Sequence, residues 1–245
     1  MSAYGPLAAR YDDMTRDVPY DALAAYYAAS LGGAHIAVET VLDLCCGTGT
    51  LSLLLAERGF ELIGVDASAE MLSEFQQKLY ELPASVRRPM LLCQRAEELD
   101  LYGTVEGCVC SLDGFNYLAP DALRETLRRL RLFIAPGGAL CFDYLAEERL
   151  RSLDGQCFVD EGEDFLCLWR AALEGEALHY GMDIFRLRRN GDWRRAQEEH
   201  TEYIYSETFL RGALTAAGFT EISFSDNGPQ HEQGRRFVTA IRGEA

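Results

Sequence analysis

The amino-acid sequence predicts an α/β fold built on an open, doubly wound sheet. Val41 to Leu44 form a short apolar run, which is typical of a parallel strand buried on both faces. The Gly47-Thr48-Gly49 turn follows and opens a segment whose leucines recur at helical spacing, at Leu51, Leu54 and Leu55. Glu61 to Val65 then make a second strand. Strand, turn, helix and strand in this order indicate a parallel unit with a crossover helix.

One carboxylate stands at the end of each of these strands, Asp43 on the first and Asp66 on the second. Ligands of doubly wound sheets bind outside the carboxyl ends of the strands, and glycines let the backbone approach a ligand closely. We therefore expect Asp66 to accept hydrogen bonds from ribose hydroxyls. Taken alone, Asp66 fits a helix N-cap equally well, and Gly47 and Gly49 fit an ordinary strand-to-helix turn.

Two details favour S-adenosylmethionine over a nicotinamide cofactor. Ser52 stands where the dinucleotide-binding pattern has its third glycine. Asp43 lies at the mouth of the turn with no nearby Lys or Arg, so it would repel a pyrophosphate and attract a cation. S-adenosylmethionine carries an ammonium and a sulfonium group and no phosphate, so we expect it as the cofactor.

Five motifs, in this order along the chain, resemble those of the class I S-adenosylmethionine-dependent methyltransferases. They are Asp43-Leu44-Cys45-Cys46-Gly47-Thr48-Gly49, Ile63-Gly64-Val65-Asp66-Ala67-Ser68 with Met71-Leu72, Leu112-Asp113-Gly114-Phe115-Asn116-Tyr117-Leu118, Ile134-Ala135-Pro136-Gly137-Gly138 and Ala216-Ala217-Gly218-Phe219. Three further stretches, Tyr11-Asp12, Val18-Pro19-Tyr20 and Glu198-Glu199-His200, most resemble a branch of small bacterial methyltransferases whose acceptors are mostly unassigned.

The resemblance implies a Rossmann-like, seven-stranded mixed sheet whose last strand is antiparallel and lies beside the sixth. It also implies cofactor-binding residues beyond Asp43, Gly47, Gly49 and Asp66, namely Tyr4, Tyr11, Cys45, Thr48, Ala67, Met71, Arg95, Ala96, Glu97, Ser111 and Leu112. Tyr4 and Tyr11 would belong to a lid over the sulfonium, although an N-terminal helix packed on the core explains them equally well. Met71 is expected near the adenine, and its spacing from Phe75 also fits a buried helix face.

Arg95 departs from the pattern of the family it resembles. Related enzymes often have an acidic residue at this position, before a small residue, and its carboxylate receives the adenine amino group. A guanidinium has donors only, so Arg95 cannot accept that bond. Ala96 can still offer its backbone to the ring, and we expect Glu97 to supply the missing acceptor.

The remaining pattern predicts the other elements of the sheet. Helices are expected at Tyr20 to Leu31, from the second motif through Leu79, at Asp121 to Phe133 and at Glu207 to Ala217. Strands are expected at Met90 to Cys93, Gly107 to Ser111, Ala139 to Tyr144, Glu221 to Ser225 and Phe237 to Arg242.

Residues 156–205 break this alternation with short aromatic and β-branched runs. Asn190-Gly191, flanked by Ile184-Phe185 and Trp193, predicts a two-residue hairpin turn. We expect an antiparallel flap inserted after the fifth strand, at the cofactor mouth, where it would form the substrate wall. Residues 1–245 would then make a single domain that carries this insertion.

The inserted segment holds one group of candidate catalytic residues. Glu198 and His200 are two apart, so on a strand both project from the same face, which also carries Arg194. If that face looks into the pocket, His200 could act as a general base oriented by Glu198, and Arg194 could pair with an acidic acceptor. An ordinary charge ladder on a solvated face is the alternative.

A second group, Asp113, Asn116 and Tyr117, follows the fourth strand and can hydrogen-bond an acceptor, unless Asn116 caps the loop. Methyl transfer from a sulfonium depends mainly on positioning the acceptor in line with the methyl-sulfur bond and on excluding water. A general base is needed only if the acceptor must lose a proton.

Composition narrows the range of partners. The chain has 39 acidic and 23 basic residues and a formal net charge of -16, which argues against nucleic acid because such binding needs a clustered basic surface. A chain of 245 residues with 48% apolar residues can bury a full core. There is no signal peptide and no apolar run long enough to span a membrane, so we expect a cytoplasmic monomer or homodimer.

The eight cysteines and four histidines carry no metal-ligand spacing, and no C-x-x-C pair occurs. We expect no metal. The function predicted is methyl transfer from S-adenosylmethionine to a small molecule. A nicotinamide-dependent oxidoreductase and a non-catalytic S-adenosylmethionine-binding protein are the alternatives, and turnover to S-adenosylhomocysteine would exclude the second of these.

Overall fold

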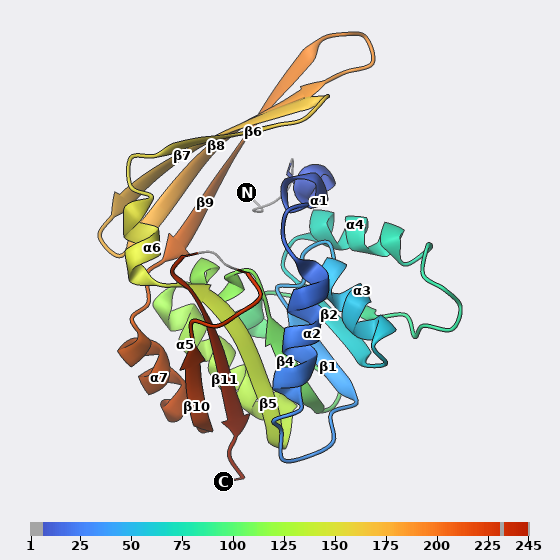
Figure 1. Ribbon diagram of the computed structural model, residues 1–245, viewed down its shortest axis with the longest axis vertical. Coiled ribbons are helices and arrows are strands. Elements are labelled where there is room, and N and C mark those ends of the chain that lie inside the picture. Colours follow the sequence, from blue (N-terminus) through green and yellow to red (C-terminus); the bar gives the residue numbers. More distant parts are fainter. Residues whose placement is uncertain (1–6, 231–232, 245) are drawn as a thin grey trace.

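A seven-stranded sheet forms the centre of the computed structural model, which describes residues 7–230 and 233–244 (Figure 1). Its strands lie in the order β10-β11-β5-β4-β1-β2-β3. Their bounds are β1 Thr40–Leu44, β2 Glu61–Asp66, β3 Met90–Cys93, β4 Val105–Cys110, β5 Ile134–Leu145, β10 Phe219–Ser225 and β11 Arg235–Arg242. The pairs along β3, β2, β1, β4 and β5 are parallel, and β11 pairs antiparallel with both β5 and β10. The predicted fold class, with its antiparallel last strand beside the sixth, is confirmed.

Helices cover both faces of this sheet because alternate residues of each buried strand point to opposite sides. On one face, Val41 of β1 and Leu62 of β2 pack with helices α2 (Tyr20–Leu31) and α3 (Thr50–Glu57). Helix α4 (Ala69–Lys78) lies on the same face, where its Phe75 fills the space beside Gly64 of β2. On the other face lie α5 (Pro120–Phe133) and α7 (Glu207–Ala216).

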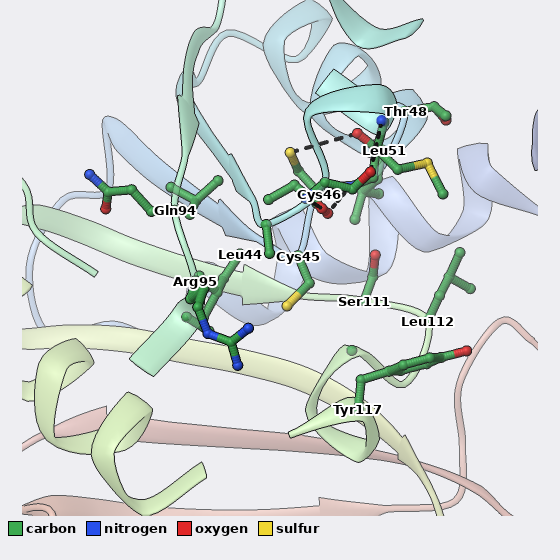
Figure 2. A pocket seen from close by; sticks show the side chains of 18 of the residues that line it. Leu44, Cys45, Cys46, Thr48, Leu51, Gln94, Arg95, Ser111, Leu112 and Tyr117 are labelled. Atoms are coloured by element: carbon green, nitrogen blue, oxygen red, sulfur yellow. Dashed lines mark hydrogen bonds between the residues drawn. The ribbon is translucent and has the colours of Figure 1, made fainter. Parts of the chain in front are cut away.

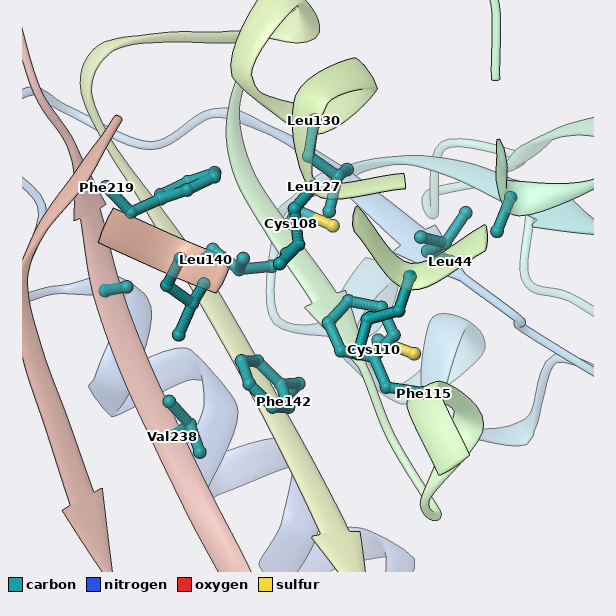
Figure 3. Close-up of a cluster of buried hydrophobic side chains, with 14 of the residues drawn as sticks. Leu44, Cys108, Cys110, Phe115, Leu127, Leu130, Leu140, Phe142, Phe219 and Val238 are labelled. Carbon is teal, nitrogen blue, oxygen red and sulfur yellow. The ribbon is translucent and has the colours of Figure 1, made fainter. Parts of the chain in front are cut away.

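The main hydrophobic core lies between the sheet and α5 and α7 (Figure 3). Leu44, Cys108, Phe142 and Val238 come from four different strands, and Phe115 contacts the ring of Phe142 with centroids 4.7 Å apart. Burying such side chains contributes roughly 1.5–3 kcal/mol each. This core therefore holds the strand ends in fixed positions at the edge where the loops meet.

Strand β5 begins five residues earlier than Ala139, where the sequence predicts its start. The Gly137-Gly138 pair resembles a turn in sequence, yet it lies within the strand, and the register between β4 and β5 shifts between Val105 and Gly107. A Cβ on Gly138 would lie 2.5 Å from the carbonyl oxygen of Glu106, so only glycine allows β4 and β5 to approach this closely.

A second, four-stranded antiparallel sheet follows β5 and helix α6 (Glu147–Ser152). Its strands are β6 (Cys157–Glu161), β7 (Phe165–Glu174), β8 (Ala177–Leu187) and β9 (Trp193–Tyr203). Figure 1 shows this sheet standing over the loop edge of the large sheet, on the side from which α1 (Tyr11–Met14) also approaches. The antiparallel insertion predicted between residues 156 and 205 is thus present.

The β8–β9 hairpin differs from the two-residue turn that Asn190-Gly191 predicts. Leu187 pairs with Trp193, so residues 188–192 form the loop. Gly191 has a φ of 86°, but Asn190 is not among the residues with positive φ, as a two-residue type I′ turn would require. The loop closes with bonds from the Arg188 amide to the Asp192 carbonyl and from the Gly191 amide to the Arg188 carbonyl. No helix within the described ranges is long and apolar enough to cross a membrane.

Candidate active site

A cavity of about 630 Å³ opens at the carboxyl ends of β1, β2 and β4 (Figure 2). Most of the residues predicted to bind the cofactor line it: Tyr11, Cys45, Gly47, Thr48, Asp66, Ala67, Met71, Arg95, Ala96, Glu97, Ser111 and Leu112. Its lining also includes residues not assigned to the cofactor from the sequence, among them Tyr20, Cys46, Gln94 and Tyr117. The cavity volume is in the range of small-ligand sites.

The glycine turn shapes one wall of this cavity through two different effects. Gly47 and Gly49 both have positive φ, 54° and 77°. A Cβ on Gly47 would meet nothing within 4 Å, so this backbone faces open space where a ligand can approach. A Cβ on Gly49 would lie 2.3 Å from the ring of Phe75. Gly49 does not line the cavity; it is needed for packing of the turn against α4.

Asp66 connects the second strand to the glycine turn. Its Oδ2 accepts the Gly47 amide at 2.9 Å and its Oδ1 accepts the Ser68 amide at 2.8 Å. Each carboxylate oxygen keeps further acceptor capacity, so the side chain can still receive ribose hydroxyls. Burial raises the pKa of Asp66, and the backbone bonds from Ser68 and Gly47 partly offset that shift. These residues fit an adenosine group of S-adenosylmethionine.

Asp66→Ala is expected to weaken binding of both S-adenosylmethionine and S-adenosylhomocysteine by about 1.5–3 kcal/mol, because a charged hydrogen-bond acceptor is removed. Isothermal calorimetry measures both affinities. Glu57→Ala, at an exposed position of α3, is the matched control and should leave them unchanged. Equal affinities for wild type and Asp66→Ala would remove Asp66 from the cofactor site.

Asp43 is placed differently from the sequence prediction. It is buried behind the turn and does not line the cavity, and its Oδ2 accepts the Ser52 hydroxyl at 2.5 Å. Ser52 thus occupies the third-glycine position because its hydroxyl holds this carboxyl. Burial raises the pKa of Asp43 to about 7, with the charge of Asp66 adding to the rise and the Ser52 bond opposing it. Asp43 therefore supports the turn from behind through Ser52 and makes no direct contact with the cavity.

Asp43→Asn is expected to raise the melting temperature of the cofactor-free protein more at pH 8 than at pH 4. Because the folded pKa lies above the ordinary value of 3.8, the native state binds the proton more tightly than the unfolded chain does. The wild type therefore loses stability as pH rises from about 4 to about 7, and the uncharged amide avoids that loss. Equal shifts at both pH values would contradict this assignment.

The opposite side of the cavity is formed by the segment after β3. Arg95 pairs with Glu97 through Nε at 2.7 Å, and both side chains line the cavity, as does Ala96 between them. Figure 2 shows Arg95 and Tyr117 bordering the cavity with Cys46 and Ser111. The Glu97 carboxylate thus lies in the cavity lining, bonded to Arg95, and its role as the adenine acceptor stays a prediction.

Met71 lines the cavity from the first turn of α4, as predicted for a residue near the adenine. The Ser68 side chain caps this helix and accepts the Met71 amide at 3.2 Å. Capping by Ser68, whose own amide is held by Asp66, fixes the helix start relative to the end of β2.

The N-terminal segment lies across the mouth of the turn. Asp12 accepts the Thr48 hydroxyl at 2.6 Å and pairs with Lys78 at 2.5 Å. Lys78 also donates to Thr50 at 2.8 Å. Tyr11 and Tyr20 line the cavity from the same segment, while Tyr4 lies outside the described residues. The sequence indicated a lid from its tyrosines but not the ionic contact of Asp12 with Lys78, which are far apart in the chain.

Of the two groups of predicted catalytic residues, only Tyr117 lines the cavity, and the others lie next to it. Glu198 and His200 are buried on the same face of β9, with His200 Nε2 3.0 Å from Glu198 Oε2. Glu198 Oε1 accepts the Leu7 amide at 2.7 Å. The His200 ring stands edge-on to Tyr117, which lines the cavity, at a centroid distance of 6.0 Å. Arg194, near the start of β9, is exposed.

Asn116 has a structural role and not the predicted contact with an acceptor. Its amide nitrogen donates to the carbonyls of Leu145 and Tyr203 at 3.1 and 3.0 Å, and its oxygen accepts the Leu145 amide at 3.0 Å. These bonds join the 3-10 helix η3 (Gly114–Tyr117) to the ends of β5 and β9. Because Asn116 is fully buried and bonded to backbone on both sides, it orients Tyr117 next to it.

Asp113 faces a buried arginine that sequence analysis missed. Arg235 on β11 pairs with Asp113 Oδ1 at 2.7 Å and also with Asp143 on β5. Asp143 accepts the amides of Leu112 and Asp113 at 2.9 and 3.1 Å, so it holds the loop after β4, where both residues have positive φ.

Glu202 on β9 is a second buried charged residue that sequence analysis missed. Glu202 could have been found from the sequence, because it continues the period-two pattern of Glu198 and His200.

Comparison with known proteins identifies the family. The Methyltransferase domain family matches residues 41–138. "Putative methyltransferase YqeM" of Bacillus subtilis is 30% identical over 97% of this chain and 96% of its own length. An S-adenosylmethionine-dependent methyltransferase from Clostridium acetobutylicum has the same fold, with a TM-score of 0.84 at 24% identity, covering 98% of this chain and 99% of that chain. The sugar N-methyltransferase KedS8 from Streptoalloteichus gives a TM-score of 0.79 at 22% identity, with 96% and 93% covered.

The sequence match covers almost the whole chain, and it leads to the same family as the glycine turn, Asp66 and the strand order. These comparisons support a methyltransferase over the nicotinamide-dependent oxidoreductase. They also support an enzyme over a non-catalytic S-adenosylmethionine-binding protein. The chain belongs to the class I S-adenosylmethionine-dependent methyltransferases, and S-adenosylmethionine is its cofactor.

Proposed function

We propose that the chain methylates a small molecule that binds between the cofactor cavity and the inner face of the four-stranded sheet. The main support for this proposal is the contact between Tyr117 and His200, with ring centroids 6.0 Å apart. Tyr117 lines the cofactor cavity, and His200 belongs to the inserted sheet. An acceptor next to Tyr117 would therefore meet the cofactor on one side and β9 on the other.

The inserted sheet has the construction expected of a substrate wall. On its inner face, Cys167, Met182 and Ile184 pack against Leu7 of the N-terminal segment. This apolar packing continues toward the buried polar residues of β9, so the wall changes from apolar to polar along its length. Apolar surface excludes water from a sulfonium, and a few placed polar groups orient a ligand.

The polar residues have distinct proposed roles. When bound, the cofactor supplies an electrophilic methyl group. Glu198 orients His200 because its Oε2 faces the ring Nε2, which then carries the hydrogen and leaves the lone pair on Nδ1. His200 is the proposed base for an acceptor that must lose a proton. Asp113, held by Arg235, contributes negative charge to the same region. Positioning by these groups accounts for most of the required catalysis.

The overall charge supports a small acceptor and opposes nucleic acid. With 39 acidic and 23 basic residues, the surface repels a phosphate chain at most approaches. KedS8, which has the same fold over most of this chain's length, is described as a sugar N-methyltransferase, so the architecture is compatible with an acceptor of that size.

Incubation with methyl-labelled S-adenosylmethionine and separated cell fractions tests the proposal. We expect label to enter the small-molecule fraction and not the RNA, DNA or protein fractions. Boiled enzyme and Asp66→Ala are the controls for cofactor-dependent transfer. Label recovered only in a macromolecular fraction would contradict the proposal.

A further inference from the structure

A cluster of buried ionisable side chains lies next to Tyr117, which His200 and Glu202 contact directly. Glu198, His200 and Glu202 come from the inner face of β9. Asp113 and Arg235 approach from the loop after β4 and from β11. The members of this cluster come from segments far apart in the chain. The tertiary fold brings them together, and no local sequence pattern predicts the cluster.

Glu202 differs from Glu198 in what holds it. The two oxygens of Glu198 face the Leu7 amide and the His200 ring. Glu202 accepts hydrogen bonds from the phenol groups of Tyr117 and Tyr180, the latter at 3.4 Å. Both of these partners are neutral. Tyr117 also lines the cofactor cavity. Glu202 is thus a buried carboxyl that is hydrogen-bonded to a residue of the cavity lining.

Among the fully buried groups of this region, which include Asp143 beside Arg235, carboxyls outnumber cations. Asp113, Asp143, Glu198 and Glu202 supply four carboxyls. Against them stand the Arg235 guanidinium and the His200 imidazole, and within residues 7–230 and 233–244 Arg235 is the only buried Lys or Arg. Two half-buried arginines also act on these groups, Arg149 of α6 on Tyr180 and Arg186 of β8 on Glu198. Burial and the charge of Asp113 raise the pKa of Glu202 to about 8, while Tyr117, Arg235 and Tyr180 lower it. An added cation would restore the balance and favour the ionised carboxylate.

We propose that the methyl acceptor is an amine that arrives as an ammonium ion, and that Glu202 binds this ammonium. The inference rests on the proposed function. The ammonium nitrogen first gives one proton to His200 Nδ1, which breaks an N–H bond and leaves the nitrogen lone pair. That lone pair forms a bond to the methyl carbon, and the methyl-sulfur bond breaks with its electron pair on sulfur. The methylated ammonium leaves with S-adenosylhomocysteine, and His200 returns its proton to water.

An amine suits this cluster better than a hydroxyl acceptor. An alkyl ammonium has a pKa of about 10, like that of lysine, so at neutral pH it carries the charge that Glu202 requires. Imidazole can remove a proton from it with a modest energy deficit, whereas an alcohol is a far weaker acid. An anionic acceptor would be placed near the buried carboxyls of Glu198 and Glu202 and is disfavoured.

Chemical blocking of amines tests the acceptor class even when the metabolite itself is unidentified. The small-molecule fraction of cells is split, and one half is treated with acetic anhydride in water at mildly alkaline pH, which converts amines to neutral amides. We expect methyl label to enter the untreated half and to fall at least tenfold in the treated half. Undiminished label after acetylation overturns the amine inference, whereas no small-molecule label in the untreated half overturns the proposed function itself.

Glu202→Gln tests the role of this residue by a split between binding and turnover. The amount of extract that gives half the maximal rate should rise at least tenfold, with a much smaller change in maximal rate and unchanged S-adenosylmethionine affinity. In the wild type, that half-saturating amount should fall as pH rises towards 8, because Glu202 ionises, and the amide should remove this dependence.

Glu199→Gln, the exposed neighbour on the opposite face of β9, is the matched control and should behave as wild type. Glu202→Asp keeps a carboxyl and should recover part of the lost binding. If Glu202→Gln changes neither the half-saturating amount nor its pH dependence, Glu202 does not bind the acceptor. The acetylation result stands independently of how well any variant folds.

Discussion

His200→Gln is expected to lower the rate of methyl transfer by about 10²–10⁴-fold, the range for loss of a positioned general base, and to leave S-adenosylmethionine affinity nearly unchanged. His200 is buried against Glu198 and Tyr117 and does not line the cofactor cavity. The glutamine keeps a donor for Glu198 but cannot take a proton. The measurement is the rate of S-adenosylhomocysteine formation with the small-molecule fraction, alongside calorimetry of cofactor binding.

His179→Gln is the matched control, because His179 lies on the opposite face of the inserted sheet, exposed and bonded to Thr201 at 3.0 Å. It should retain the wild-type rate. Glu198→Gln should lower the rate less than His200→Gln, since it weakens the orientation of the base and does not remove it. A His200→Gln enzyme with full activity would show that no base acts at this position. Loss of cofactor affinity in parallel would instead place His200 in the cofactor site.

Arg235→Met is expected to lower the free energy of unfolding by about 3–5 kcal/mol, because it leaves the buried carboxyls of Asp113 and Asp143 without their shared cation. Urea denaturation at pH 7 measures this loss. At pH 4 the loss should shrink, since a buried carboxyl that has lost its cation can take up a proton and avoid the uncompensated charge.

Arg128→Met is the control for removing an arginine. Arg128 is exposed on α5 and pairs with Glu125, three residues away, at 2.6 Å. An exposed pair contributes about 0–1 kcal/mol, so this variant should be nearly as stable as wild type. Equal effects of the two substitutions would mean that Arg235 is not the compensating charge of the loop after β4.

The elements of the large sheet were predictable because their signals are local. Thr40–Leu44, Tyr20–Leu31 and Met90–Cys93 each carry an apolar run or a helical period within the element itself. The start of β5 was not predicted because it depends on a contact between distant residues. Gly138 lets β5 lie close to the Glu106 backbone on β4, and this contact cannot be seen in the local sequence. The β8–β9 loop was longer than Asn190-Gly191 suggested because the cross-strand pair nearest the turn is Leu187 with Trp193.

Which of the predicted residues line the cavity follows the same division. Asp66 and Gly47 were identified because strand, turn and charge lie close together in the sequence. Asp43 and Gly49 belong to the same motif but do not line the cavity. Asp43 lies behind the turn and bonds Ser52, and Gly49 packs against Phe75. Arg235 lies 92 positions after Asp143, one of its two partners, and no periodic pattern joins them. Such pairs are specified by the topology of β11 beside β5.

A crystal structure with S-adenosylhomocysteine bound would show how the cofactor and the acceptor region lie relative to each other. We expect that the ribose hydroxyls contact Asp66, that the adenine lies between Met71 and Ala96, and that the sulfur faces Tyr117 and the inner face of β9. A ligand bound elsewhere, or a sulfur atom directed to solvent away from Tyr117 and His200, would contradict this arrangement.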